Sequence, residues 1–206
     1  MLQLGKRVAA TVSVVLAASL PALAVFFTAA ASPDAPSDAL PVSVVADSRP
    51  AFSLDAVEDD VLWLARCIYS ETKQPHEQEL VAWVVRNRVE TAYRGVSTYE
   101  GTVLDPYQFS AFNPGYPRRA LYMNLTPASV SPGWQRALEI AHEVYHAPAA
   151  ERPFPLDTRH FYSERSMVGR RAPVWADGRR PVQNVKYQVD PRRFRFFSGI
   201  AAATRL

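Results

Sequence analysis

Apolar residues recur every three or four positions over residues 57–68 and again over residues 80–89, and this spacing predicts two helices that bury one face. The apolar positions are Val57, Val61, Leu64, Ala65, Ile68, Leu80, Val81, Val84, Val85 and Val89. Residues 86–88 and 90 are polar and are expected on the wetter side of the second helix. Residues 72–75 break the pattern, and the second helix is expected to begin at about His76. Glu71 therefore falls at a corner between two packed helices.

A third helix is predicted over residues 132–146. Ser131 can cap it, Pro132 suits its first position, and Pro148 follows its end. Its apolar stripe consists of Trp134, Leu138, Ala141, Val144 and Tyr145. Short strands are expected within residues 182–197, so the predicted fold class is α+β and mostly α.

Between residues 99 and 126 the chain is rich in Pro, Gly, Tyr, Phe and Asn, which predicts a long irregular segment. Long loops within a compact domain are commonly functional. Aromatic rings beside amide and hydroxyl groups suit sugar faces and acetamido groups, so residues 105–116 are expected to line a glycan cleft. The alternative is a loop whose aromatic rings pack against the core.

Glu71 is the candidate working residue. A carboxyl group at a corner between packed helices can be partly desolvated, which raises its pKa and lets it act as a general acid near neutral pH. This is the chemistry of glycosidic bond cleavage. The alternative is that Glu71 caps the next helix or forms an ion pair with Arg66 or Lys73, and such ion pairs are more common than active sites.

Several separated motifs resemble, in the same order, those of the SleB-type cell wall hydrolases, the family of spore-cortex-lytic enzymes. The resemblance covers residues 57–200. The motifs are Leu64-Ala65-Arg66, Ile68-Tyr69-Ser70-Glu71, Val81-Ala82-Trp83-Val84-Val85, Asn87-Arg88-Val89, Gln108-Phe109-Ser110, His160-Phe161-Tyr162 and Trp175-Ala176. Ser70 stands where the family usually has Gly, and residues 72–75 depart from its Ala-Arg-Gly-Glu-like run.

The resemblance implies a lysozyme-like catalytic domain with Glu71 as the acid/base. The implied activity is that of a muramidase or lytic transglycosylase that cleaves the MurNAc–GlcNAc strand of peptidoglycan, with no cofactor and no metal. The substrate-binding residues that we expect in such a site are Tyr69, Thr72, Gln108, Phe109, Ser110, Asn113, His160 and Tyr162.

The N-terminal region predicts export. Residues 1–7 carry Lys6 and Arg7, and no charge interrupts residues 8–31. This is typical of a signal peptide, cleaved after Ala24 or near Ala31, or of a membrane anchor of about 20 residues. The predicted organisation is a signal or anchor segment (1–31), a flexible linker rich in Pro, Ser, Asp and Ala (32–52) and a catalytic domain (53–206). The expected location is the periplasm or cell envelope, with an inner-membrane anchor if the segment is retained.

The composition and charge of the chain limit the kinds of molecule that we expect it to bind. The chain has 206 residues, a hydrophobic content of 48% and a formal net charge of +3, which fits one globular domain besides the N-terminal region. Basic residues gather after Arg159, and no nucleic-acid motif accompanies them. In an exported domain, this charge favours a surface that faces the wall or the membrane, and a solvated face is the alternative. We expect a monomer that binds peptidoglycan strands and no nucleic acid. Cys67 is the sole cysteine, so no internal disulfide forms.

One motif in the sequence is typical of a different function, zinc binding. His142-Glu143-Val144-Tyr145-His146 is a literal His-Glu-x-x-His, in which two imidazoles one helical turn apart can bind zinc while the Glu activates water. Pro148 stops this helix soon after the second histidine, and the sequence offers no convincing third ligand. A zinc metallopeptidase and a non-catalytic peptidoglycan-binding protein therefore remain the two rivals to a glycosidase.

Overall fold

The computed structural model describes residues 49–183 and 186–202, which belong to the second of the two units into which the chain divides, residues 46–206. Its helices are α1 (Asp59–Glu71), α2 (Pro75–Glu90), α3 (Tyr99–Leu104), α4 (Arg119–Met123) and α5 (Trp134–His146), and its strands are β1 (His160–Tyr162) and β2 (Arg195–Phe197). The predicted signal or anchor segment, and the predicted linker up to residue 48, lie outside the described residues. No helix within the described ranges is long and apolar enough to cross a membrane.

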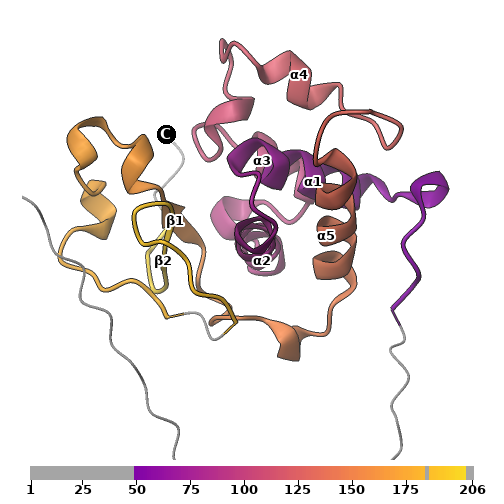
Figure 1. The fold of residues 1–206 in the computed structure, drawn as a ribbon. Coiled ribbons are helices and arrows are strands. Elements are labelled where there is room, and N and C mark those ends of the chain that lie inside the picture. Colours follow the sequence, from indigo (N-terminus) through magenta and orange to yellow (C-terminus); the bar gives the residue numbers. More distant parts are fainter. Residues whose placement is uncertain (1–48, 184–185, 203–206) are drawn as a thin grey trace, which may run out of the picture. The chain divides into compact units, whose positions relative to one another are not determined.

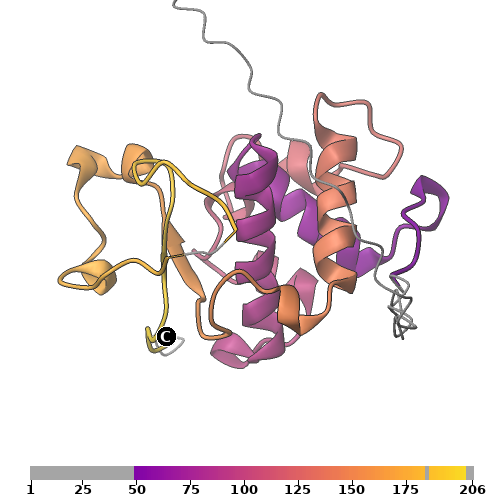
Figure 2. The ribbon, with the colours of Figure 1, turned by 60° about the horizontal axis from the view of Figure 1, so that its bottom comes forward.

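Helix α2 is the centre of the domain. In Figure 1 it is seen nearly end-on, with α1 and α3 above it, α5 on one side and the two strands on the other. The turned view in Figure 2 also shows α2 between α5 and the two strands. The six residues from Leu80 to Val85 are all buried, and Trp83 is among the largest of the fully buried side chains. These six consecutive apolar residues point to all sides of the helix, so this part of α2 is stable only when other elements cover it, which explains the position of α2.

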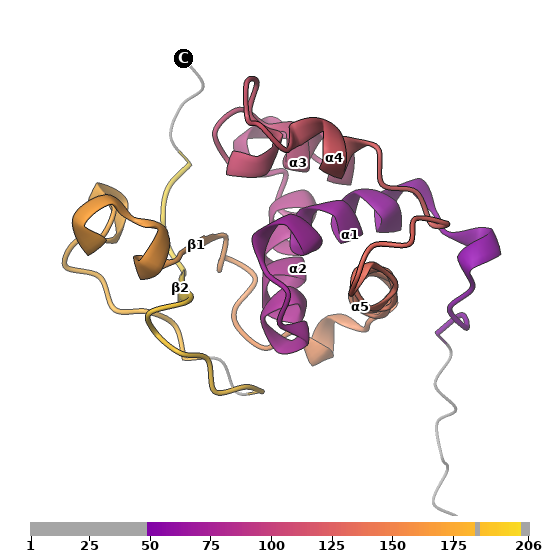
Figure 3. The same ribbon diagram turned by 45° about the horizontal axis from the view of Figure 1, so that its top comes forward.

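Helices α1 and α5 pack against each other and against α2, as Figure 3 shows with α5 viewed nearly end-on. Most residues of the two predicted apolar stripes are buried, whereas Val57, which lies before α1, and Tyr145 are partly buried. The predicted start of the third helix was wrong by two residues. Gly133 takes a left-handed conformation with φ 73°, which interrupts the helical backbone. Pro132 therefore lies in a turn before the helix, and α5 begins at Trp134.

The segment of residues 99–126 is less irregular than predicted, because it contains α3 and α4. Thr98 caps α3, since its hydroxyl oxygen accepts a hydrogen bond from the backbone N–H of Gly101 at 3.1 Å. Tyr99 and Val103 bury one side of this short helix. Residues 105–118 have no helix longer than one turn, as expected for a loop.

The two strands form one small antiparallel sheet in which Phe161 is opposite Phe196. Strand β2 lies within the range predicted for strands, whereas β1 lies upstream of it. Aromatic rings fasten the sheet to the core, since Phe196 stacks on Phe154 with ring centroids 5.7 Å apart. The structure is 49% helical with few strands. This confirms an α+β domain that is mostly α.

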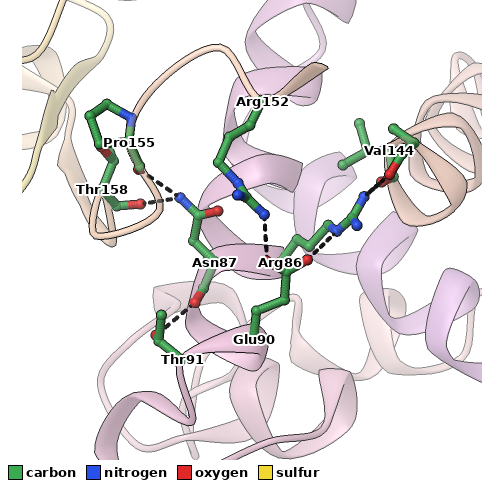
Figure 4. Close-up of polar contacts among 9 residues, drawn as sticks. Arg86, Asn87, Glu90, Thr91, Val144, Arg152, Pro155 and Thr158 are labelled. Carbon is green, nitrogen blue, oxygen red and sulfur yellow. Dashed lines mark hydrogen bonds and ion pairs between the residues drawn. The ribbon is translucent and has the colours of Figure 1, made fainter. Parts of the chain in front are cut away.

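Polar contacts hold the end of α5 and the following chain on α2 (Figure 4). The Arg86 guanidinium donates to the carbonyl oxygen of Val144 at 2.6 Å and to that of Ala147 at 2.7 Å. The Glu90 carboxylate accepts hydrogen bonds from Arg86 at 2.7 Å and from Arg152. The two bonds from Arg86 satisfy carbonyl groups at the C-terminal end of α5 that have no partner within the helix, and Glu90 holds Arg86 and Arg152 in place.

Candidate active site

Glu71 is the last residue of α1, and the backbone becomes extended at Thr72. Its half-buried side chain lines a cleft of about 470 Å³. The other lining residues are basic, polar, aromatic or thioether side chains: Arg88, Arg165, Arg193, Gln108, Ser110, Asn113, Ser163, Ser166, Tyr107, Phe161, Tyr162, Phe194 and Met167. The predicted corner between two helices is therefore the wall of a cleft, and Glu71 is the sole acid among the described residues that line it.

The Glu71 carboxyl group has the electrostatics of a general acid. Burial raises its pKa from the usual 4.5 to about 7, and the nearby charge of Arg88 opposes this rise. The ion pairs considered from the sequence do not form, because Arg66 donates to the carbonyl oxygen of Leu125 at 2.8 and 3.0 Å and Lys73 donates to that of Tyr69. Within the described part of the chain, no hydrogen-bond partner holds Glu71 in its charged form. Both protonation states are therefore populated near neutral pH.

Arg88 is a site residue that the sequence analysis placed wrongly. It was expected on the wetter side of α2, but it is 5% exposed and its guanidinium lies over the ring of Phe109 at 5.0 Å. Its Nε donates to the carbonyl oxygen of Arg159 at 2.8 Å, and its Nη1 is buried without a hydrogen-bond partner in the described structure. Arg88 therefore provides a fixed positive charge beside Glu71.

The neighbouring Asn87 was also expected on the wetter side and is fully buried. Its Nδ2 donates to the carbonyl oxygens of Pro155 at 3.3 Å and Thr158 at 3.0 Å, as Figure 4 shows. Together with the bond from Arg88 to Arg159, these contacts fix residues 155–159 on α2, and β1 begins at the next residue. The pair Asn87-Arg88 thus positions the strand that carries Phe161 and Tyr162 into the cleft.

Four of the predicted substrate-binding residues line the cleft beside Glu71: Gln108, Ser110, Asn113 and Tyr162. The Asn113 side-chain oxygen accepts a hydrogen bond from the backbone N–H of Tyr107 at 2.9 Å. Tyr107 has a φ of 65°, a left-handed conformation that is uncommon for an aromatic residue, and its side chain is 84% exposed. Such a strained, exposed residue held by a neighbour is a common feature of ligand sites.

Tyr69 and Thr72 flank Glu71 in the sequence but do not line the cleft. The Tyr69 hydroxyl donates to the carbonyl oxygen of Pro132 at 3.1 Å, and that of Thr72 donates to Glu77 at 2.6 Å. Both side chains are buried. Their contact with substrate stays a prediction, and their observed partners are structural.

Phe109 and His160 also lie outside the lining of the cleft. Phe109 is 1% exposed and belongs to the main core. His160 Nε2 shares a hydrogen bond with the Tyr93 hydroxyl at 2.9 Å. Burial lowers the pKa of His160 to about 4, helped by the charges of Arg88 and Arg159, so this imidazole is neutral at pH 7. The observed contacts of both residues are therefore structural, and their contact with substrate stays a prediction.

An ion pair between the partly exposed Arg193 and the buried Glu77 holds the C-terminal side of the cleft against the start of α2. Arg193 donates from Nε and Nη2 to the two oxygens of Glu77, at 2.5 and 2.7 Å, and Glu77 is 1% exposed. Burial alone would raise the pKa of Glu77, but the hydrogen bonds from Arg193 and Thr72 outweigh burial and lower it. The pair therefore stays charged at neutral pH and fixes the chain that places Phe194 in the cleft.

The other predicted motif lies apart from this cleft. His142 and His146 do not line it, and Glu143 forms an ion pair with Arg136 at 3.7 Å.

Comparisons of the chain with protein-family models, with curated proteins and with solved structures give no match. The case for a function therefore rests on the residues and geometry of the site.

Proposed function

We propose that this protein is a peptidoglycan-cleaving glycosidase, a muramidase or lytic transglycosylase with a lysozyme-like domain, in which Glu71 is the general acid and base. The observation that carries the proposal is the state of Glu71. It lines a cleft of about 470 Å³ with a pKa raised to about 7, and it has no hydrogen-bond partner among the residues described. A group that is to give up and then take a proton at neutral pH needs such a pKa.

The reaction needs two proton transfers at one carboxyl group. Protonated Glu71 donates to the oxygen that bridges the two sugars, and the glycosidic bond breaks as the leaving sugar takes that proton. The carboxylate then accepts a proton from the 6-hydroxyl of the muramoyl residue, which closes a 1,6-anhydro ring, or from a water that adds to the sugar. Either route returns Glu71 to its protonated form.

The absence of a second acid among the described lining residues favours a single-acid mechanism. Glycosidases that use two carboxyl groups hold them about 5–10 Å apart across the scissile bond. Where one of them is lacking, the substrate's own acetamido group can stabilise the developing cation. N-acetylated sugars carry that group, which matches the class of substrate proposed.

The rest of the lining is consistent with an anionic amino-sugar polymer. Tyr107, Phe161 and Tyr162 offer aromatic surface for sugar rings, and the amide of Gln108 can pair with acetamido groups. Arg165 places a guanidinium on the lining, which pairs with Asp190 at 2.8 Å and is exposed enough for its other N–H groups to meet carboxylates of peptidoglycan. The motifs that resemble SleB-type hydrolases are far apart in sequence, yet residues from three of them line one cleft with Glu71, which supports the resemblance.

The location proposed for this activity is the periplasm or cell envelope, where peptidoglycan lies, with the protein acting as a monomer. The charge pattern of residues 1–31 supports export, since a basic head precedes a long uncharged stretch.

Digestion of purified sacculi tests the proposal. The expected result is release of soluble disaccharide-peptides, and their masses distinguish a 1,6-anhydro end from a hydrolysed reducing end. Either glycan product supports the proposal. Release of peptides with intact glycan strands would favour a peptidase instead, and binding to sacculi without any release would favour a non-catalytic binding protein.

A further inference from the structure

Three side chains with metal-ligand chemistry meet at the start of α1 and the end of α5, and none of them lines the Glu71 cleft. They are Glu58, the residue before α1, and His142 and His146, which lie one turn apart on α5. One ligand atom from each lies within 4.8 Å of the others. His146 Nε2 is 3.0 Å from one Glu58 oxygen, and His142 Nδ1 is 4.0 Å from the other.

The hydrogen bonding of His142 determines which of its nitrogens is available. Its Nε2 is 2.8 Å from the carbonyl oxygen of Pro50, and a carbonyl can only accept, so Nε2 carries the hydrogen. The ring is 7% exposed and packs edge-on against Phe52 at 5.4 Å, which fixes its orientation. In the neutral ring, Nδ1 therefore keeps a free lone pair, and this atom lies 4.0 Å from a Glu58 oxygen. A backbone carbonyl on the other ring nitrogen is the usual support of a metal-bound histidine.

In the neutral ring, His142 Nδ1 and the neighbouring carboxylate oxygen of Glu58 are both acceptors. Their separation of 4.0 Å is too long for a hydrogen bond. A tetrahedral zinc ion with bonds of about 2.0–2.1 Å holds its ligand atoms about 3.3 Å apart, so the exposed Glu58 side chain has to move closer by about 1 Å to share a zinc ion with His142. His146 Nε2 lies 3.0 Å from the same carboxylate and becomes the second nitrogen ligand in the neutral tautomer that carries its hydrogen on Nδ1.

We propose that Glu58, His142 and His146 bind one divalent zinc ion with a structural role. Two imidazoles and one carboxylate form a ligand set that suits zinc, with water in the fourth position. The sequence offers no third ligand close to the two histidines, and the fold brings Glu58 to them. Glu143 does not join them, since it pairs with Arg136 at 3.7 Å, so the base of a zinc peptidase is not in place. The ion links the chain before α1 to the end of α5.

Zinc titration of the full chain, purified without a polyhistidine tag and stripped with a chelator, tests this site. We expect one zinc per chain by calorimetry and by elemental mass spectrometry after desalting. With free zinc about 100-fold above Kd, the melting temperature of a domain this size should rise by about 5–10 °C. Digestion of sacculi should be the same with and without chelator, because the three ligands lie outside the cleft.

The variants Glu58→Gln and His146→Gln remove one ligand each at partly exposed positions, and Glu58 makes no capping hydrogen bond that would be lost. Each should weaken zinc binding at least about 10–100-fold and, at the same zinc concentration, reduce the thermal shift to about half or less. His76→Gln and Glu143→Gln are the matched controls and should bind zinc as the unaltered chain does. Zinc binding below one ion per chain, or equal affinity in the ligand variants and the controls, would overturn the proposal. Loss of sacculus digestion on chelation would overturn the structural role.

Discussion

The raised pKa of Glu71 has a cost in stability that can be measured without any substrate. The pKa is 4.5 in an exposed carboxyl group and about 7 in the folded protein. Below pH 4.5 the group is protonated in both states and has no effect. Between pH 4.5 and 7 the unfolded chain loses its proton more readily than the folded chain, so the free energy of unfolding falls as the pH rises. Above pH 7 the group is charged in both states, and the free energy of unfolding no longer falls on its account.

The variant Glu71→Gln removes this cost, because the amide has nearly the same shape and no charge. A shift of about 2.5 pKa units corresponds to roughly 3 kcal/mol at 1.36 kcal/mol per unit. Water in the cleft reaches part of Glu71, so about 2–3 kcal/mol is the expected gain. At pH 8 the variant should therefore be more stable than the unaltered chain by this amount, and its melting temperature should be higher by about 4–12 °C.

The assay is urea or thermal unfolding of both proteins at several values between pH 4 and pH 8.5. The difference should be near zero at pH 4, grow through the interval from 4.5 to 7 and then stay constant. Glu100→Gln, at an exposed position of α3, controls for the loss of one surface carboxylate. A difference that is independent of pH, or a variant that is less stable at pH 8, would refute the reasoning about the environment of Glu71.

Other predictions concern the lining, the buried pair and the pH dependence of the reaction. Gln108→Ala should lower the rate of glycan release and leave the melting temperature unchanged, whereas Phe109→Ala should destabilise the fold by about 3–5 kcal/mol, because Phe109 is 1% exposed. Arg193→Ala should cost about 2–3 kcal/mol in urea unfolding because it leaves Glu77 buried and unpaired, and the double variant with Glu77→Gln should recover part of that loss. In a pH–rate profile, kcat/KM should fall above pH 7 as Glu71 loses its proton.

The long helices could be predicted from the sequence because their stability comes from one apolar stripe that packs in the core. Most of the predicted stripe residues are buried in α1, α2 and α5, whereas Val57, Val89 and Tyr145 are partly buried. Glu71 lies at the end of α1. The irregular chain of residues 105–118 followed from its Pro and Gly content. Short elements were harder to predict, because β1 has three residues and exists through its pairing with β2, 33 or more residues later.

The parts of the site that the sequence could not predict depend on contacts between distant segments. The helical spacing predicts that Arg88 lies on the surface. The carbonyl oxygen of Arg159 and the ring of Phe109 instead hold it in the interior. The placement of His142 beside Glu58 likewise requires α5 to pack against α1. No local pattern gives these distances. The motif Asn87-Arg88 was the one signal that could have indicated a structural role for both residues.

The most direct test of the central claim compares the unaltered chain with Glu71→Gln on purified sacculi, with the released fragments identified by mass spectrometry. The variant should fold, as its unfolding curve will show, and should release glycan fragments about 10²–10⁴-fold more slowly, since its amide can neither donate nor accept the catalytic proton. A folded Glu71→Gln variant that releases the same fragments at a rate close to that of the unaltered chain would contradict the account.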